Sequence, residues 1–154
     1  MGVEIERKFL LSDSNILEGL SGVPYRQGYI VASKGRVVRV RKAGGRGFLT
    51  IKSAKRGISR AEYEYEIPGA DADEMLATLC SQPLIEKVRY RLPVGQHVWE
   101  IDVFSAANDG LIVAEVELAN ESEAVEMPAW VGREVSHDYR YTNSELVRRP
   151  YSSW

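Results

Sequence analysis

Hydrophobic and charged residues alternate along most of this chain, beginning with Val3-Glu4-Ile5-Glu6-Arg7-Lys8-Phe9. Side chains of a β-strand point alternately to opposite faces, so the two glutamates and the lysine lie on one face and the apolar residues on the other. The same alternation recurs further along the chain. It predicts strands over residues 3–11, 25–32, 36–42, 47–53, 61–68, 85–92, 97–104 and 111–119.

Glycine and proline divide these strands with short connections. Gly44-Gly45 and Pro93-Val94-Gly95-Gln96 read as tight turns, which join antiparallel neighbours. Helices are expected over 71–82, with Asp71 as N-cap, and more weakly over 13–20, 121–127 and 143–149, the last capped by Asn143. Without a repeat or a long linker, residues 1–154 are expected to form one α+β domain dominated by antiparallel sheet.

The amino-acid composition limits the kinds of molecule that this protein is expected to bind. The 154 residues are 44% hydrophobic and 27% charged, as in ordinary globular proteins, and the net charge is −2. Such a balance gives no overall attraction to nucleic acid or to an anionic membrane, so an anion site requires local clustering of Lys and Arg. The single cysteine, Cys80, excludes an internal disulfide and fits a reducing compartment. With no secretion signal or apolar run of transmembrane length, a cytoplasmic protein is expected.

The charged residues of each predicted strand gather on one face and share a sign within short runs. On any single strand, a half-buried sheet with charges facing water explains this pattern. Eight consecutive strands favour a small closed barrel, with the charged faces inward and the apolar faces covered by helices on the outside. The inward residues would then include Arg39 and Arg41; Lys52; Glu62, Glu64 and Glu66; Lys87, Arg89 and Arg91; Glu100 and Asp102; Glu115 and Glu117.

A lumen of this kind is costly unless its charges are paired or filled. Opposite signs offset one another only in part. A polyanion with divalent cations would complete the pairing, because arginine and lysine bind phosphate oxygens and clustered carboxylates bind hard metal ions. Mg²⁺ or Mn²⁺ suits carboxylate, water and phosphate ligands.

These residues resemble the CYTH family, also called triphosphate tunnel metalloenzymes. Its Glu-x-Glu-x-Lys signature stands here as Glu4-Ile5-Glu6-Arg7-Lys8. Glu4 through Leu10 and Arg26-Gln27-Gly28-Tyr29 look closest to the short bacterial branch that cleaves inorganic triphosphate. The further motifs follow in order over nearly the whole chain: Arg39-x-Arg41, Lys52, Glu62-x-Glu64, Lys87-x-Arg89, Glu100-x-Asp102 and Glu115-x-Glu117.

The resemblance implies an eight-stranded antiparallel tunnel that binds a linear triphosphate, with a role for each matching residue. Lys8 and Tyr29 would act at the cleavage site. Some relatives carry a basic residue where this chain has Thr142, which leaves one end of the tunnel open to question. Phosphate contacts are expected from Lys8, Arg39, Arg41, Lys52, Lys87, Arg89 and Arg140; metal binding from Glu4, Glu6, Asp102, Glu115 and Glu117; and an acidic wall from Glu62, Glu64 and Glu100.

The reaction expected is metal-dependent hydrolysis of inorganic triphosphate to diphosphate and phosphate. Cys80 reads as a packed hydrophobe, and His97 and His137 lie outside the charged faces, so direct attack by water is favoured over a covalent intermediate. Class IV adenylyl cyclase activity and hydrolysis of thiamine or nucleoside triphosphates stay open. So do a noncatalytic triphosphate or polyphosphate binder, a solvated sheet without a ligand, and a homodimer formed through the apolar exterior.

Overall fold

The strands form one antiparallel sheet in a computed structural model that describes residues 2–154. The predicted strands are present, with ends that differ by one or two residues in most cases. A further short strand follows them near the C-terminus. The strands are β1 (Gly2–Leu11), β2 (Val23–Ala32), β3 (Arg36–Ala43), β4 (Arg46–Ser53), β5 (Ser59–Ile67), β6 (Ile85–Val94), β7 (His97–Phe104), β8 (Ile112–Glu117) and β9 (Val131–Glu134).

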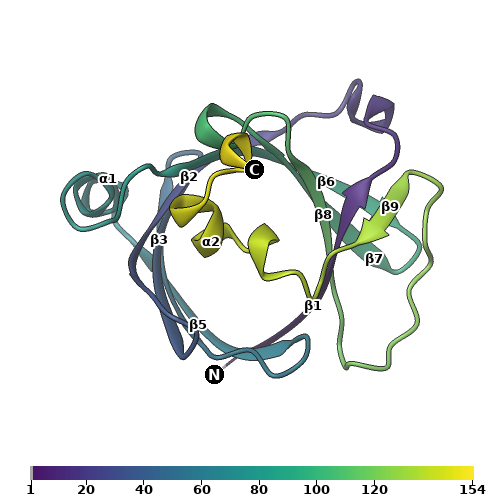
Figure 1. Ribbon diagram of the computed structural model, residues 1–154, viewed down its shortest axis with the longest axis horizontal. Helices are drawn as coiled ribbons and strands as arrows, with labels where there is room; N and C mark the ends of the chain where they lie inside the picture. Colours follow the sequence, from purple (N-terminus) through teal and green to yellow (C-terminus); the bar gives the residue numbers. More distant parts are fainter. Residues whose placement is uncertain (1) are drawn as a thin grey trace.

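The sheet closes into a barrel. Its strand order is β5-β4-β3-β2-β6-β7-β8-β1, and β5 pairs back with β1, so eight strands make a ring (Figure 1). The closing pairs run from Gly2 opposite Glu62 to Ile5 opposite Ser59. Further along, the same edge of β1 pairs with β9, with Leu11 opposite Val131. The predicted eight-stranded antiparallel barrel is confirmed.

Both predicted tight turns are present. Gly44 lies between β3 and β4 with φ 59°, and Gly95 lies between β6 and β7 with φ 61°. Residues with a Cβ avoid this left-handed region, so glycine suits both positions. The turns hold β3 against β4 and β6 against β7 in continuous antiparallel register.

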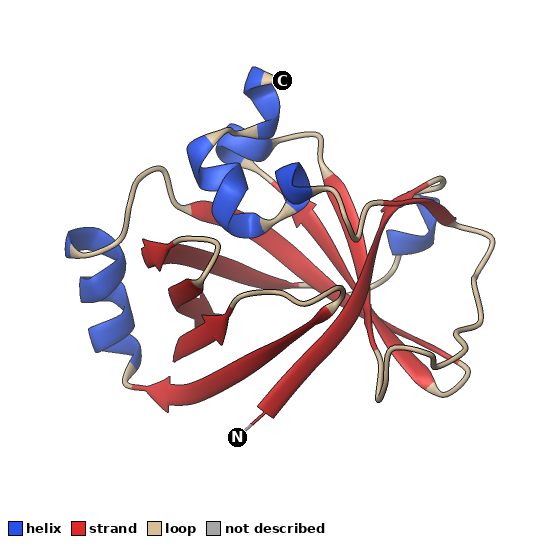
Figure 2. Cartoon of the chain, turned by 60° about the horizontal axis from the view of Figure 1, so that its bottom comes forward, coloured by secondary structure: helices blue, strands red, loops and turns tan. Residues whose placement is uncertain are grey.

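The apolar face of the barrel points outward and is covered in two places. Helix α1 (Gly69–Thr78) packs outside β3 and β4, where Ala72 and Leu76 meet Val40 (Figure 2). On another side, Trp99 packs between Phe9 and Trp130, at ring-centroid distances of 5.5 and 5.4 Å. Outward apolar packing leaves the charged faces directed into the barrel.

The helices differ from the predictions. Helix α1 begins after Pro68, and Asp71 lies in its first turn without capping it. Residues 13–20 form only the 3₁₀ turn Asn15–Leu17. The helix expected over 121–127 is wrong: Glu123 accepts a hydrogen bond from the backbone N–H of Ala119, so its side chain competes with helical hydrogen bonding.

The C-terminal segment lies across one end of the barrel instead of on its outer wall. It contains the 3₁₀ turns Tyr139–Tyr141 and Tyr151–Ser153 and helix α2 (Asn143–Arg148), drawn in yellow within the ring of strands in Figure 1. Thr142 is the N-cap of α2, and its hydroxyl accepts from the N–H of Glu145, a role predicted for Asn143. None of the helices within residues 2–154 combines the length and apolar character needed to cross a bilayer.

The end of the barrel under α2 is apolar. Leu146 and Val147 of α2, with Tyr141 before it, join a buried cluster that includes Tyr29 and Val113 from the barrel strands. The C-terminal segment therefore closes this end of the barrel, and the charged interior lies beneath it.

Candidate functional site

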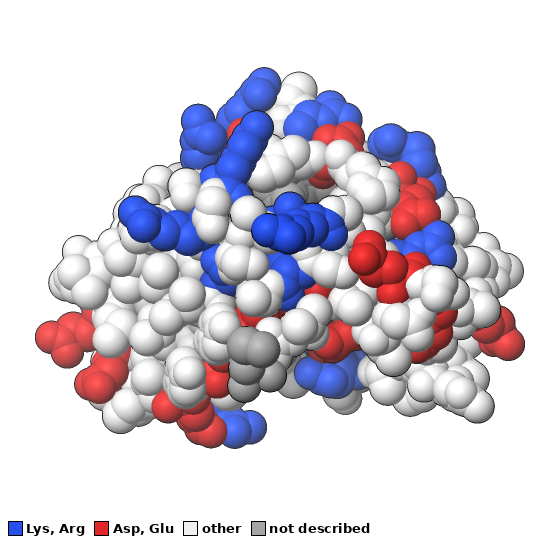
Figure 3. Space-filling view, turned by 90° about the horizontal axis from the view of Figure 1, so that it is seen from below, with Lys and Arg blue, Asp and Glu red and all other residues white. Residues whose placement is uncertain are grey.

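A cavity of about 690 Å³ lies inside the barrel and is lined by residues from all eight strands, of which every strand but β2 contributes charged side chains. Residues opposite one another in an antiparallel pair share a face. Three such pairs connect four strands: Lys8 is opposite Glu115, Glu115 is opposite Glu100, and Glu100 is opposite Arg91. One row of charged side chains therefore crosses four strands. Figure 3 shows Lys and Arg side chains gathered around a hollow in the surface, with Asp and Glu beside them.

Most of the predicted site residues meet in this cavity. Asp102 and Arg140 are the exceptions. The predicted residues that line it are Glu4, Glu6, Lys8, Tyr29, Arg39, Arg41, Lys52, Glu62, Glu64, Lys87, Arg89, Glu100, Glu115 and Glu117.

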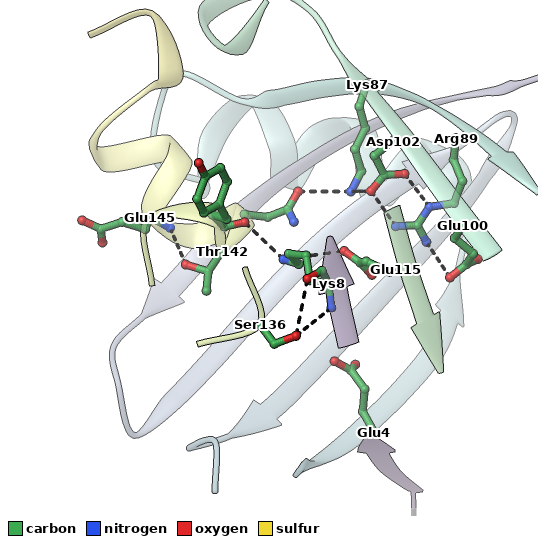
Figure 4. A network of polar contacts seen from close by, with 12 residues as sticks. Glu4, Lys8, Lys87, Arg89, Glu100, Asp102, Glu115, Ser136, Thr142 and Glu145 are labelled. Atoms are coloured by element: carbon green, nitrogen blue, oxygen red, sulfur yellow. Dashed lines mark hydrogen bonds and ion pairs between the residues drawn. The ribbon is translucent and has the colours of Figure 1, made fainter. Parts of the chain in front are cut away.

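Asp102 lies behind two of the cations. It is 1% exposed, and its carboxylate accepts from Lys87 Nζ at 2.7 Å and from Arg89 Nε and Nη2 at 2.7 and 2.9 Å (Figure 4). Although burial opposes ionisation, these two cations hold the pKa of Asp102 well below its ordinary value. The carboxylate thus fixes Lys87 and Arg89 at the cavity wall.

Lys8 joins the cavity to the C-terminal segment. Its Nζ donates to the carbonyl oxygen of Tyr141 at 3.1 Å and lies 3.6 Å from Glu115 (Figure 4). Burial alone would lower the pKa of Lys8, but Glu115, Glu6 and Asp102 outweigh it and raise the pKa. The amine is therefore charged and fixed at the closed end.

Carboxylates dominate another part of the wall. Lys52 Nζ lies 2.8 Å from Glu4 and 3.4 Å from Glu62, and enclosure together with Glu4 raises the pKa of Glu62 to about 7. Enclosure and neighbouring carboxylates also raise the pKa values of Glu6 and Glu117. Within residues 2–154, no three Asp, Glu, His or Cys side chains converge closely enough to hold a metal ion unaided.

Arg39 and Arg41 present guanidiniums from β3. Arg39 Nη2 donates to Thr50 and Glu64, at 3.2 and 3.4 Å, while its buried Nε has no acceptor among the described residues. Arg41 Nε donates to Gln27 at 2.9 Å. Desolvation, with Arg39 and Arg89 nearby, lowers the pKa of Arg41 to about 10.

Arg140 does not reach the cavity. Its guanidinium donates to Asp138 at 2.8 and 3.1 Å and lies over the Trp154 ring, 4.8 Å from the centroid. Thr142 does line the cavity, as do its neighbours Asn143 and Ser144. Asn143 accepts from Lys87 Nζ at 3.1 Å, so α2 adds an amide to the site.

Sequence reasoning also missed Tyr25, Lys55 and Arg60, which line the cavity. Tyr25 shares the parity of Tyr29, so alternation along the predicted strand 25–32 would have found it. Arg60 shares the parity of Glu62 and would have been found had β5 been predicted to begin at Ser59. Lys55 lies in a turn, where no periodicity operates. His97, which was expected outside the charged faces, also lines the cavity, and its Nε2 contacts Glu123.

Comparisons with known proteins agree with this geometry. The CYTH domain family matches residues 2–151. An inorganic triphosphatase of Acetivibrio thermocellus is 48% identical over 154 residues, which cover 100% of this chain and 99% of that protein. One of Nitrosomonas europaea is 40% identical over 149 residues, or 94% and 96% of the two chains.

A solved structure of an inorganic triphosphatase has a TM-score of 0.66 and 35% identity, and covers 93% of this chain and 96% of that chain. A structure described as an adenylyl cyclase with dominant triphosphatase activity has a TM-score of 0.60 at 15% identity, over 76% and 80% of the chains, and shows the fold alone. The chain belongs to the CYTH domain family, as the order of its charged motifs predicted.

Proposed function

We propose that this protein hydrolyses inorganic triphosphate to diphosphate and phosphate inside the barrel, with Mg²⁺ or Mn²⁺ as cofactor. The observation that carries the proposal is the enclosed cavity, in which cations and carboxylates face the same space. Two relatives that match nearly the whole chain at 40–48% identity are inorganic triphosphatases. A linear triphosphate with metal ions supplies both signs of charge that such a wall requires.

The cations would bind the phosphate oxygens. Arg39 and Arg41 come from β3, and Lys87 and Arg89 come from β6. These two strands flank β2, so a linear anion lying across β2 would be contacted by both pairs. Guanidiniums match phosphate geometry with paired hydrogen bonds.

The carboxylates fit a divalent cation. Glu6 and Glu117 have raised pKa values because enclosure and other carboxylates disfavour their charged forms, and a divalent cation removes that repulsion. Mg²⁺ is commonly held by one or two carboxylates with water and substrate phosphates, which needs no complete protein cage. Glu6, Glu115 and Glu117 would hold it, with Glu4 beside them, and when bound it would neutralise the triphosphate and acidify a water.

The chain's own residues would then orient the bond and stabilise charge. Lys8, held by Tyr141 and Glu115, is placed to stabilise charge on phosphate oxygens, and Tyr29 lies at the same end of the cavity. Cys80 packs on the outside of the barrel against α1, so it cannot serve as nucleophile. We therefore assign direct attack by water, with Asp102 positioning Lys87 and Arg89.

A substrate panel tests the function. Phosphate release is measured from inorganic triphosphate, ATP and thiamine triphosphate, each with Mg²⁺, Mn²⁺ or a chelator, and cyclic AMP is assayed in the ATP samples. The expected result is metal-dependent release from inorganic triphosphate with little from the other two. Cyclic AMP formation, or tight binding of triphosphate without turnover under all metal conditions, would contradict the proposal.

A further inference from the structure

The ring of Tyr25 contacts arginines from two different strands. The Cζ atoms of Arg41 and Arg89 each lie 4.9 Å from its ring centroid. Strand β2 runs between β3 and β6, and Tyr25 lies opposite Ala43 on one side and Lys87 on the other. Both arginines are therefore its diagonal cross-strand neighbours, within reach of an aromatic side chain.

The two arginines are held differently. Arg89 is fixed by Asp102 and lies 3.4 Å from Glu100. Arg41 forms no ion pair within residues 2–154, and its contacts are the Gln27 amide oxygen and the Tyr25 ring. A carboxylate in their place would compete with an anionic ligand, whereas an amide oxygen and an aromatic face hold the cation and leave its charge available.

We propose that Tyr25 is a positioning residue, whose ring holds the guanidiniums of Arg41 and Arg89 in place to bind the phosphate groups of the substrate. The role rests on the proposed function, which makes the ligand a phosphate anion. Two guanidiniums repel each other, and the negative face of a ring between their strands offsets part of that repulsion. Paired hydrogen bonds to phosphate depend on the orientation that the ring provides.

The test compares Tyr25→Leu with Tyr25→Phe, which keeps the aromatic face. Tyr65→Leu is the matched control, because Tyr65 is 58% exposed on the outside of the barrel. Affinity for inorganic triphosphate is measured by calorimetry in a chelator, and KM and kcat are measured with Mg²⁺. Tyr25→Leu should weaken affinity roughly tenfold and act mainly on KM, whereas Tyr25→Phe and Tyr65→Leu should stay within about twofold of the unaltered chain.

Unchanged affinity in Tyr25→Leu would overturn the role. So would an equal loss in Tyr25→Phe, which would assign the effect to the hydroxyl. In an Arg41→Gln background, Tyr25→Leu should cost much less, and additive losses would also contradict the proposal. If Tyr25→Leu does not fold, Tyr25→Met is measured in its place, because it also lacks the aromatic ring. Calorimetry separates the hypothesis of hydrolysis from the hypothesis about Tyr25. If the unaltered chain binds triphosphate without cleaving it, hydrolysis is refuted, but the effect of Tyr25→Leu on affinity can still be measured.

Discussion

At the scale of the residue, Lys8 shows how one side chain depends on the opposite end of the chain. It comes from the first strand, yet its amine is held by the carbonyl oxygen of Tyr141. The backbone around it is held in the same way, since the carbonyl oxygen of Lys8 accepts from the N–H of Val135 at 2.8 Å. The C-terminal segment thus fixes the position of Lys8 as well as covering the cavity.

Replacing Lys8 with alanine tests its assignment. We expect Lys8→Ala to lower triphosphate turnover about 100- to 1,000-fold, because a preorganised charge is removed from the site. Arg7→Ala is the control: Arg7 is the next residue in the same strand but pairs with Glu134 on the outside, so its loss should leave turnover nearly unchanged. Turnover is measured beside the melting temperature, and full activity in a folded Lys8→Ala protein would refute the assignment.

Most cavity residues could be predicted from sequence because strand alternation fixes the face of each side chain. The partner of a side chain was harder to predict. Asp102 shares a face with Glu100, but only the register, which sets it opposite Arg89, shows that it lies behind two cations. Arg140 follows the barrel in an irregular segment, where no period reveals its direction, and it stacks on Trp154 instead.

At the scale of the element, α1 depends on the absence of side chains in the strands beneath it. A Cβ at Gly47 would lie 2.7 Å from the Cβ of Ala72 in the helix, and one at Gly28 would lie 2.7 Å from the Cβ of Cys80, just after the helix. The helix is therefore held close against the barrel wall. Because it covers the outer face, its packing stabilises the barrel without contacting the cavity.

Gly47→Ala should overpack this contact. We expect it to lower the free energy of unfolding by about 1–3 kcal/mol and the melting temperature by roughly 3–10 °C. Gly45→Ala is the matched control, because no atom lies within 4 Å of a Cβ added there. Thermal melting measures both. Turnover per folded molecule should stay constant in both variants, and an undiminished melting temperature in Gly47→Ala would show that α1 can shift freely.

The elements that were missed or predicted wrongly from the sequence have no clear periodic pattern of hydrophobic and polar residues. Strand β9 has the sequence Val-Gly-Arg-Glu, which offers neither alternation nor length, and it exists because the free edge of β1 accepts it. The segment 121–127 has residues that tolerate a helix, but Glu123 makes contacts with Ala119 and His97 instead. Tertiary contacts decided both cases, and these are invisible in a local pattern.

At the scale of the whole molecule, the carboxylates in and behind the cavity wall include two groups with opposite pKa shifts. Glu4 and Asp102 contact cations, which outweigh burial and lower their pKa values, so they stabilise the fold above their ordinary pKa and lose that effect as the pH falls. Glu6, Glu62 and Glu117 have raised pKa values, because enclosure and neighbouring carboxylates disfavour their charge. In the folded protein these glutamates keep protons that they have already released in the unfolded chain. The free energy of unfolding therefore falls as the pH rises from the ordinary glutamate pKa to the raised pKa of the folded state.

The metal-free protein should therefore melt at a higher temperature near pH 5 than at pH 8, because folded Glu62, whose pKa is raised to about 7, keeps its proton at pH 5 and releases it by pH 8. Burial lowers the pKa of Lys87 to about 7, and this opposes the trend only above pH 7. Mg²⁺ or Mn²⁺ should raise the melting temperature more at pH 8, where the carboxylates are ionised. At about 100 times its dissociation constant, a bound ion adds roughly 2.7 kcal/mol to the free energy of unfolding. Thermal melting at both pH values, with and without metal, measures this without reference to catalysis.

Glu6→Gln distinguishes metal binding in the cavity from metal binding elsewhere on the protein surface. The amide removes one repelled charge, so the metal-free variant should lose less stability between pH 5 and pH 8 and gain less from metal at pH 8. Glu18→Gln, on the exposed surface, should behave like the unaltered chain. Equal metal gains at the two pH values, or an undiminished gain in Glu6→Gln, would mean that ions bind outside the cavity, and the carboxylates there would need another explanation.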